Sequence, residues 1–329
     1  MASHKTLILE KKDVARLIDV KGAIKAIEAV FREYGQGRTE MPPKLYLHLD
    51  RYGGDFRAMP AYIERKEKSA LKWVNVHPKN IRLGLPTVMA VIILSDPRNG
   101  LPLCVMEGTY ATSLRTAGAG AAAAKYLARK DSRVAAMVGC GVQARTQLPA
   151  LLHVLDIKEA RVWGHNRKVI KEFIFDMKGT KIKLIPSACI KECVSESDII
   201  VTTTPSRKPL VKLEWLKKGV HINAIGADAK GKQELDPRIL KKAKIVVDSR
   251  EQASHSGEIN VPLRKGAISK HDIYADIGEI VAGKKKGRAN SYEITVFDST
   301  GLAIQDAAIA DLIYKTAVKK GIGKWAGFV

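Results

Sequence analysis

The chain has 329 residues, with 56 lysines and arginines against 34 aspartates and glutamates, which gives a formal net charge of +22. Hydrophobic residues make up 46% of it, which excludes intrinsic disorder, and the length predicts two domains. No apolar stretch reaches the roughly 18 residues of a membrane span, so we expect no transmembrane helix. The amino terminus lacks the apolar core of a signal peptide, so we expect a cytoplasmic protein.

The positive charge is spread along the chain and consists mostly of lysine. Its densest run, Lys284–Arg288, has no aromatic residue interleaved. Nucleic-acid-binding proteins cluster their charge and favour arginine for phosphates and bases. We therefore interpret the excess as a solvated surface and expect neither nucleic acid nor a membrane as partner.

The four cysteines, at positions 104, 140, 189 and 193, are too few for a disulfide framework. Cys189 and Cys193 share a helical turn, but no second pair of cysteines or histidines completes a zinc site. We expect reduced thiols and no metal.

The amino-terminal part predicts an α+β region. A helical pattern covers residues 20–34, and strand-like runs follow at 45–49, 70–76 and 87–94, separated by turn residues. A helix rich in alanine and glycine is expected over residues 111–127, where small side chains allow close packing.

After residue 131 the pattern changes to strands that alternate with helices. An amphipathic helix over residues 301–320 ends the chain. This alternation predicts an α/β fold, a Rossmann-type doubly wound parallel sheet joined to an α+β domain. We expect one domain at residues 1–118 and 302–329 and an inserted dinucleotide-binding domain at 119–301. The expected strands are 133–138, 159–163, 183–185, 197–204, 221–225, 244–248 and 293–297.

The segment Gly139–Ala144 matches the pattern G-x-G-x-x-A. It follows an apolar strand and opens a helix, which is the context that a dinucleotide-binding loop requires. Gly139 permits a tight turn, Gly141 lets the backbone approach a pyrophosphate, and the helix start supplies N–H groups. We therefore predict cofactor contacts from Gly139, Gly141, Val142 and Gln143.

Cofactor choice depends on the residues after the second strand, Gly164-His-Asn-Arg167. A carboxylate there would bind the ribose and repel a 2′-phosphate, but none is present. Asn166 can donate to a phosphate, Arg167 can pair with it, and His165 can stack or donate. These residues favour NADP over NAD; the alternative is that Arg167 is merely solvated. Thr203 and Thr204, at a strand end, line either the cofactor crevice or the core.

Several motifs in order resemble the ornithine cyclodeaminase/μ-crystallin family over essentially the whole chain. They are Met59-Pro60, Lys72, Leu85–Thr87, Ser113–Ala117, Gly139–Gln143, Ile225–Asp228 and Asp298–Gly301. Further segments are most similar to an archaeal amino-acid dehydrogenase branch of that family, and these are Met41–Lys44, Leu71–Asn75, Thr203–Lys208 and Gly231–Asp236.

The resemblance implies a homodimer that catalyses NAD(P)-dependent, reversible oxidative deamination of L-alanine to pyruvate and ammonia. It also implies cofactor contacts from Thr87, Arg115, Ala224 and Ser299. The segment His165–Arg167 is more similar to an NADP-using branch of the family.

The chemistry of an amino acid substrate assigns roles to four residues. Arg115, in a helix start, can bind a carboxylate with its planar fork, and Lys44 is a second candidate. Lys72 lies in an apolar strand, where burial near other cations lowers proton affinity and makes it a usable acid/base. Asp228 follows a strand at the carboxyl edge of the sheet and can take a proton from the substrate ammonium. The competing interpretations are that Arg115 forms a surface ion pair, that Lys72 lies on an edge strand and faces water, and that Asp228 only shapes a turn.

The predicted reaction has Arg115 and Lys44 hold the carboxylate while Lys72 and Asp228 remove protons from the amine. Hydride then leaves Cα for the nicotinamide, and water attacks the iminium. Three alternatives remain open: an ornithine cyclodeaminase, in which the substrate's own amine traps the imine, a cyclic ketimine reductase, and a non-catalytic NADP-binding protein.

Overall fold

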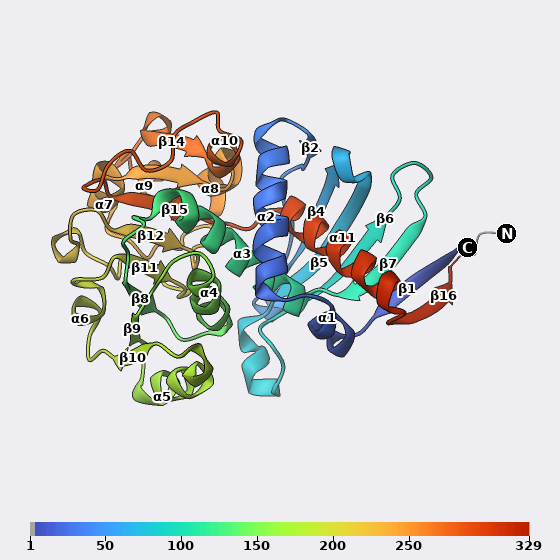
Figure 1. Cartoon of the computed structure of the whole chain (residues 1–329), viewed down its shortest axis with the longest axis horizontal. Coiled ribbons are helices and arrows are strands. Elements are labelled where there is room, and N and C mark those ends of the chain that lie inside the picture. Colours follow the sequence, from blue (N-terminus) through green and yellow to red (C-terminus); the bar gives the residue numbers. More distant parts are fainter. Residues whose placement is uncertain (1–3, 329) are drawn as a thin grey trace. The chain divides into compact units, whose positions relative to one another are not determined.

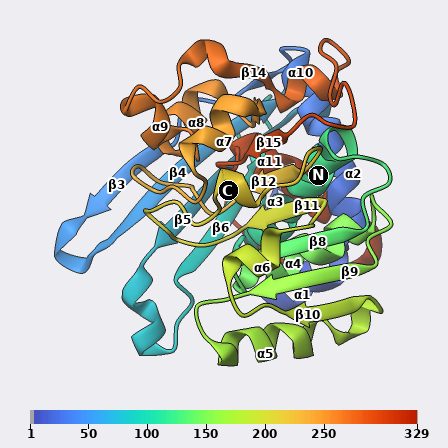
Figure 2. The same ribbon diagram turned by 90° about the vertical axis from the view of Figure 1, so that its left-hand side faces the viewer.

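The computed structural model describes residues 4–328 (Figures 1 and 2). The chain divides into two compact units, unit 1 at Met1–Arg115 with Leu302–Val329, and unit 2 at Thr116–Gly301. The first division falls inside helix α3 (Thr109–Leu127), whereas the sequence analysis placed it after residue 118. Because the helix runs without interruption through this point, no change of sequence pattern marks the division.

Unit 1 contains an eight-stranded sheet in the order β16-β1-β7-β6-β5-β4-β2, with β3 also paired to β4 (Figure 1). Strands β1 and β7 pair in parallel, and the other pairs are antiparallel. The strands are β1 (Lys5–Leu9), β2 (Thr39–Glu40), β3 (Leu45–Leu49), β4 (Gly54–Ile63), β5 (Lys68–Val76), β6 (Val88–Ser95), β7 (Pro102–Glu107) and β16 (Lys324–Gly327).

Helices cover one face of this sheet. Helix α11 (Ala303–Lys320) packs on β4, β5 and β6 and also against α2 (Val20–Gly35). A third and shorter helix of this unit is α1 (Lys11–Leu17). The α2 helix begins at Asp19, whose side chain accepts a hydrogen bond from the Gly22 N–H at 2.7 Å, a typical N-cap. The sheet face under α11 is therefore the interior of unit 1.

The opposite face of the same sheet is apolar and exposed. The strand register aligns Leu45, Ala58, Trp73 and Val91 across four neighbouring strands, so these side chains point to one side. The Trp73 ring stacks on that of Phe56, with 5.1 Å between ring centroids. We call this surface the outer sheet face, and its most exposed apolar residues are Leu45, Leu47, Trp73, Met89, Val91 and Ile93.

Unit 2 contains an eight-stranded parallel sheet in the order β10-β9-β8-β11-β12-β15-β13-β14. The chain leaves β8 toward β9 on one side and later returns beside β8 as β11, so the crevice between these strand ends is the usual ligand site. The strands are β8 (Val134–Val138), β9 (Glu159–Trp163), β10 (Lys183–Pro186), β11 (Ile199–Thr202), β12 (His221–Ala224), β13 (Lys244–Val247), β14 (Ile273–Asp276) and β15 (Thr295–Asp298). The helices are α4 (Val142–Leu152), α5 (Arg167–Asp176), α6 (Ile190–Val194), α7 (Pro237–Lys242), α8 (Arg250–Ser256), α9 (Asn260–Arg264) and α10 (Ile277–Val281).

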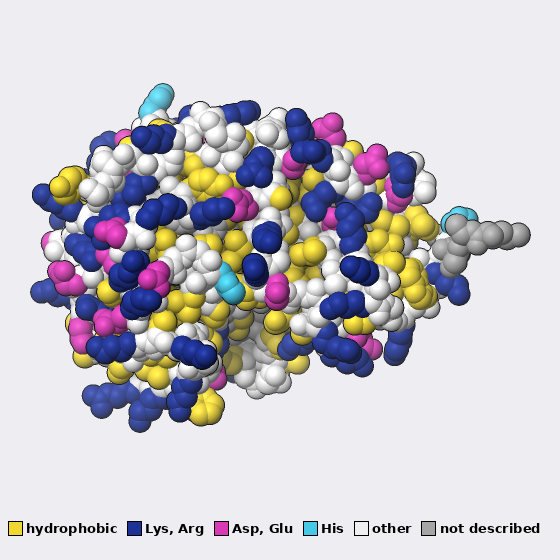
Figure 3. All heavy atoms as spheres, in the orientation of Figure 1, with side chains coloured by type: hydrophobic (Ala, Val, Ile, Leu, Met, Phe, Trp, Pro, Cys, Tyr) yellow, Lys and Arg dark blue, Asp and Glu magenta, His cyan; other side chains and the backbone are white. Residues whose placement is uncertain are grey.

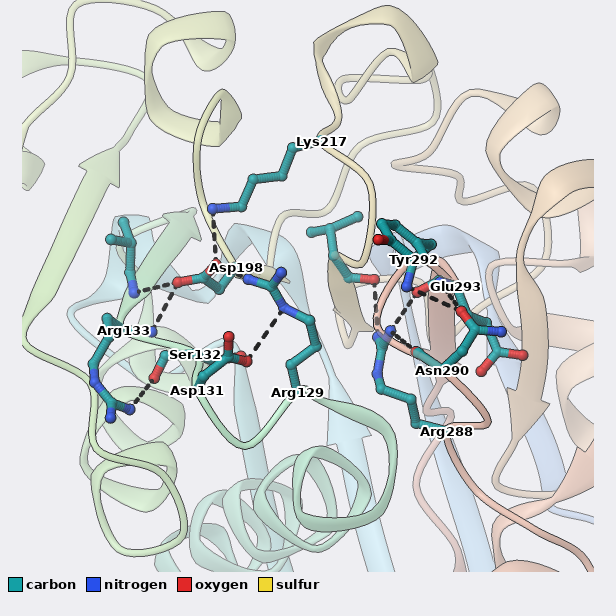
Figure 4. A network of polar contacts seen from close by, with 12 residues as sticks. Arg129, Asp131, Ser132, Arg133, Asp198, Lys217, Arg288, Asn290, Tyr292 and Glu293 are labelled. Carbon is teal, nitrogen blue, oxygen red and sulfur yellow. Dashed lines mark hydrogen bonds and ion pairs between the residues drawn. The ribbon is translucent and has the colours of Figure 1, made fainter.

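The amino edge of the unit 2 sheet is tied together by ion pairs and hydrogen bonds (Figure 4). The Asp198 carboxylate accepts from the backbone N–H groups of Arg133 and Val134 at 2.8 and 2.9 Å. It also pairs with Arg129 at 2.5 Å and Lys217 at 2.7 Å. This network fixes the starts of β8 and β11, so the two strands also end side by side at the opposite, carboxyl edge.

Lysine and arginine side chains are scattered over the face drawn in Figure 3, with acidic and apolar groups between them. Within residues 4–328, no helix is both long enough and apolar enough to cross a bilayer. All four cysteines are free thiols.

Candidate active site

Lys72 lies in the centre of the unit 1 sheet, on the face covered by α11. Its cross-strand neighbours are Met59 on β4 and Ile92 on β6, both buried. The ammonium nitrogen lies 2.7 Å from Oδ2 of Asp306 on α11, and both side chains are 1% exposed. Lys72 is therefore a buried residue of a central strand and not an edge-strand lysine that faces water.

The surroundings of Lys72 bring its pKa close to neutral pH. Burial lowers the pKa of Lys72 from 10.5 to about 7, and the positive charges of Arg115 and Lys44 act in the same direction. The Asp306 carboxylate opposes them and raises this pKa. An amine that exchanges a proton near pH 7 is suited to general acid–base catalysis.

Arg115, on α3, completes a buried cluster with the same aspartate. Its Nε donates to Asp306 Oδ1 at 3.1 Å, and its Nη1 donates to Gln305 Oε1 at 3.0 Å. Gln305 Oε1 also accepts from the N–H of Leu302 at 3.2 Å, which holds this amide at the start of α11. Asp306 thus bridges Lys72 and Arg115, and one carboxylate serves two buried cations.

Asp306 and Gln305 were not predicted as site residues from the sequence. The available signal was their position as two polar residues in a run of alanine and isoleucine that becomes fully buried in α11. A buried acid in such a run needs a cation as partner, because an unpaired buried charge is costly. The pattern alone does not identify which cation.

The other cations of unit 1 differ in their surroundings. Arg57 is buried and pairs with Asp55 at 2.7 Å, with its guanidinium 5.1 Å from the centroid of the Tyr46 ring. Lys44 is half-buried in the segment before β3. Thr87 is exposed before β6, and its carbonyl accepts from the His77 N–H at 2.8 Å.

In unit 2, the glycine-rich loop joins β8 to α4. Gly139 has φ of 117°, and a Cβ there would lie 2.5 Å from Thr203 Oγ1, so the position requires glycine. Gly141 is the N-cap of α4, and a Cβ there would meet no atom within 4 Å. The loop therefore presents an open backbone and unpaired helix N–H groups, which fit a pyrophosphate.

A cavity of about 490 Å³ lies at this loop. It opens against the ends of β8, β9 and β11, which is the crevice described above. Its lining residues are Gly139, Cys140, Gly141, Trp163, Gly164, His165, Val169, Thr203, Thr204, Pro205, Ser206 and Leu210.

A second cavity, of about 540 Å³, shares Trp163, Gly164 and His165 with the first. Asn166 caps α5 by accepting a hydrogen bond from the Val169 N–H at 3.0 Å, which leaves its amide nitrogen as the donor end. Arg167 is exposed and lines this cavity. None of the residues that line this cavity is an acid, so the cavity fits a ribose that carries a 2′-phosphate. The lining residues are Trp163, Gly164, His165, Asn166, Arg167, Ile170, Lys171, Ile174, Pro186, Ser187 and Ala188.

Five predicted site residues of unit 2 are not among those that line these two cavities. Val142 is the exposed first residue of α4, and Gln143 follows it. Ala224 and Ser299 are buried, and the Ser299 N–H donates to the Ala224 carbonyl at 3.0 Å. Asp228, in the loop after β12, accepts from Lys232 Nζ at 2.5 Å and has a side chain 34% exposed.

These observations define a class: a two-unit protein with a Rossmann-type dinucleotide domain and a second unit that holds a buried lysine–aspartate–arginine cluster. The comparisons with known proteins identify the family. The model of the ornithine cyclodeaminase/mu-crystallin family matches residues 4–321, and the chain belongs to this family.

The similar proteins cover almost the whole chain. An alanine dehydrogenase of Archaeoglobus fulgidus is 53% identical over 97% of both chains. An archaeal alanine dehydrogenase solved as a dimer with bound NAD is 52% identical, with a TM-score of 0.95 over 99% of this chain and 100% of that one. The Δ1-pyrroline-2-carboxylate reductase of Thermococcus litoralis, solved with NADH and L-proline, is 41% identical, with a TM-score of 0.95 over 97% and 99%.

Proposed function

We propose that the protein is an NAD(P)-dependent alanine dehydrogenase, which converts L-alanine, water and NAD(P)⁺ to pyruvate, ammonium, NAD(P)H and a proton. The observation that carries the proposal is the buried cluster of Lys72, Asp306 and Arg115, which combines an acid/base with a carboxylate-binding cation. The 53% identity to an alanine dehydrogenase supports this substrate.

Arg115 binds the substrate carboxylate in this proposal. Two of its five N–H donors are engaged by Asp306 and Gln305. The remaining donors provide the fork that matches a carboxylate, and the fixed side chain orients the amino acid. Lys44 adds positive potential, as its effect on the pKa of Lys72 indicates.

Lys72 and Asp228 move the protons. With a pKa of about 7, Lys72 has a substantial neutral fraction that can accept a proton, and its protonated form can return one. In oxidation, neutral Lys72 helps to deprotonate the water that attacks the iminium carbon. Asp228 takes a proton from the substrate ammonium, so that the amine lone pair assists cleavage of the Cα–H bond.

Unit 2 binds the dinucleotide, whose nicotinamide ring supplies the chemistry of hydride acceptance from Cα. Gly139, Gly141 and the start of α4 hold the pyrophosphate. Arg167 and the Asn166 amide hold a 2′-phosphate, so that NADP is preferred over NAD. The support for this preference is the absence of an acid among the residues that line the second cavity.

A second candidate is reduction of a preformed imine such as Δ1-pyrroline-2-carboxylate. It is favoured by the 41% identity and TM-score of 0.95 with the Thermococcus litoralis reductase. This reaction uses the same carboxylate-binding cation and the same proton donor, but it needs no water.

One assay separates the two functions. Absorbance at 340 nm is followed with NADH and with NADPH in the presence of pyruvate plus ammonium, Δ1-pyrroline-2-carboxylate, or neither. Cofactor oxidation with pyruvate plus ammonium supports the dehydrogenase. Turnover confined to the cyclic imine assigns the reductase instead, and no turnover with any substrate contradicts both.

We also propose that the protein is a homodimer formed through the outer sheet face. A contiguous group of exposed apolar side chains on one face of a sheet is typical of a protein–protein interface. The archaeal relative with bound NAD is a dimer.

A further inference from the structure

Glu234 is a fully buried carboxylate that joins two loops at the carboxyl edge of the unit 2 sheet. Its Oε1 accepts from the backbone N–H and the hydroxyl of Thr204, both at 2.7 Å, and its Oε2 accepts from the Gly226 N–H at 3.0 Å. Thr204 follows β11 and Gly226 follows β12, so one side chain fixes two neighbouring strand ends. A Cβ on Gly226 would lie 2.5 Å from Glu234 Oε2, so the contact is also closely packed.

Thr204 connects Glu234 to the dinucleotide cavity. Residues 203–206 line that cavity, whereas Glu234 lies behind them. The hydroxyl of Thr204 donates to Glu234 at 2.7 Å. The segment of Glu234 is paired with the same wall, because the Gln233 N–H donates to the Ser206 carbonyl at 3.0 Å and the Leu210 N–H to the Glu234 carbonyl at 2.7 Å.

Two more buried carboxylates, Glu258 and Asp298, hold the backbone around Glu234 in a series of hydrogen bonds. Glu258 accepts from the N–H groups of Glu234 and Leu235 at 2.9 and 2.7 Å. Asp298 accepts in turn from the N–H groups of Glu258 and Ile259 at 2.9 and 3.1 Å. Burial raises the pKa of Glu258 and also that of Asp298, the latter to about 8. Glu258 thus accepts from the backbone of the segment that carries Glu234, and Asp298 accepts from the backbone of the segment that carries Glu258.

We propose that Glu234 is a positioning residue for the dinucleotide, which sets the wall at residues 203–206 in its binding geometry through Thr204 without touching the cofactor. This inference rests on the proposed dinucleotide-dependent function. It concerns a residue outside the carboxylate-binding and proton-transfer groups assigned above.

The variant Glu234→Gln tests the contact directly. Both Glu234 oxygens face N–H donors, so a glutamine amide must direct its own N–H at either Thr204 or Gly226 whichever way it is turned. Thr204→Val removes the hydroxyl, which donates to Glu234 and also accepts from the Ser206 N–H at 3.3 Å, whereas Thr204→Ser retains it. Glu214→Gln is the matched control, because Glu214 is an exposed acid of the same unit that pairs with Arg238 at 2.9 Å.

NADPH and NADH binding is measured by fluorescence at a temperature where circular dichroism shows every variant fully folded. We expect the Kd to rise about tenfold in Glu234→Gln and in Thr204→Val, equivalent to ~1.4 kcal/mol, to rise less in Thr204→Ser than in Thr204→Val, and to stay near the wild-type value in Glu214→Gln. The double variant Glu234→Gln/Thr204→Val should show less than the sum of the two effects, since both break one contact.

Unchanged Kd values in Glu234→Gln and Thr204→Val overturn the inference, as does an equal loss in Thr204→Ser or full additivity in the double variant. If Glu234→Gln does not fold, the comparison of Thr204→Val with Thr204→Ser decides alone. A wild-type protein that binds neither dinucleotide contradicts the proposed function and the inference with it. Wild-type binding with unaltered variants contradicts the inference only.

Discussion

Asp306 holds Lys72 at 2.7 Å through one carboxylate oxygen while its other oxygen accepts from Arg115 at 3.1 Å. The proposed proton-transfer residue and the proposed carboxylate-binding residue of unit 1 are therefore both held by a single acid on α11. This shared partner couples their energetics, because removal of Asp306 leaves two buried cations without their counter-charge.

Replacement of Lys72 by methionine should lower kcat for alanine oxidation by about 10²–10⁴-fold, the usual contribution of a positioned acid/base. The pH profile checks the assignment. Neutral Lys72 is the base in oxidation, so the wild-type rate should rise as pH increases through about 7, and in reductive amination the dependence on its protonated form is reversed. The control is Lys68→Met on the same strand, where the ammonium donates to the Glu67 carbonyl at 3.0 Å. Wild-type turnover by Lys72→Met would refute this role.

Replacement of Asp306 by asparagine should destabilise the protein by ~3–5 kcal/mol, since two buried cations lose their carboxylate. The same change removes the charge that raises the pKa of Lys72, so the pH midpoint of oxidation should move to lower pH. Urea unfolding and the pH–rate profile measure the two effects. Adding Lys72→Met to this variant should restore part of the lost stability, and a midpoint that moves upward would contradict the argument.

Replacement of Arg115 by lysine should raise the KM for pyruvate by about 10–100-fold, because a charge-assisted hydrogen bond contributes ~1.5–3 kcal/mol. Lysine keeps the charge but not the planar fork, so kcat should change less than KM. Steady-state kinetics with NADPH and ammonium at saturation measure this. Arg98→Lys is the control, since Arg98 is an exposed loop residue paired with Asp96 at 2.7 Å. An unchanged KM would show that the carboxylate binds elsewhere.

Much of the fold could be predicted because periodicity marks regular elements. Seven strands of unit 2 and the helices α2 and α11 lie close to their predicted ranges, whereas the edge strand β14 was not predicted. Strand β4 was not predicted, although it is central to the unit 1 sheet. It contains Pro60, which lacks an N–H donor and normally argues against a sheet interior, and it begins at Gly54, directly after Gly53.

The candidate site was predictable only where residue chemistry and position coincide in the sequence. Lys72 was found because a lysine interrupts an apolar strand. Asp306 was missed because it lies far from Lys72 in the chain, and only the packing of α11 on β5 brings the two together. The carboxylate chain of Glu234, Glu258 and Asp298 was missed because most of its partners are backbone N–H groups, which any sequence supplies.

Replacement of Val91 by aspartate should convert a dimer to a monomer. Val91 lies in the outer sheet face and is 45% exposed, and a charge buried in an apolar interface is costly. Val318→Asp is a matched control, because Val318 is 49% exposed on α11, away from that face. Size-exclusion chromatography with light scattering gives the mass of each. A dimeric Val91→Asp variant would show that the subunits meet through another surface.

Replacement of Arg167 by aspartate should reverse the cofactor preference. The wild type should have a higher kcat/KM with NADPH than with NADH, because Arg167 lines the second cavity and no acid there repels a 2′-phosphate. The new carboxylate would repel that phosphate and bind the ribose hydroxyls, so the NADPH/NADH ratio should fall by at least about 100-fold, because two charge-assisted contacts of ~1.5–3 kcal/mol each are lost. Lys168→Asp makes the same charge change at the next position, which is exposed and does not line the cavity. If both variants lower the ratio equally, the preference arises from general surface charge and not from Arg167.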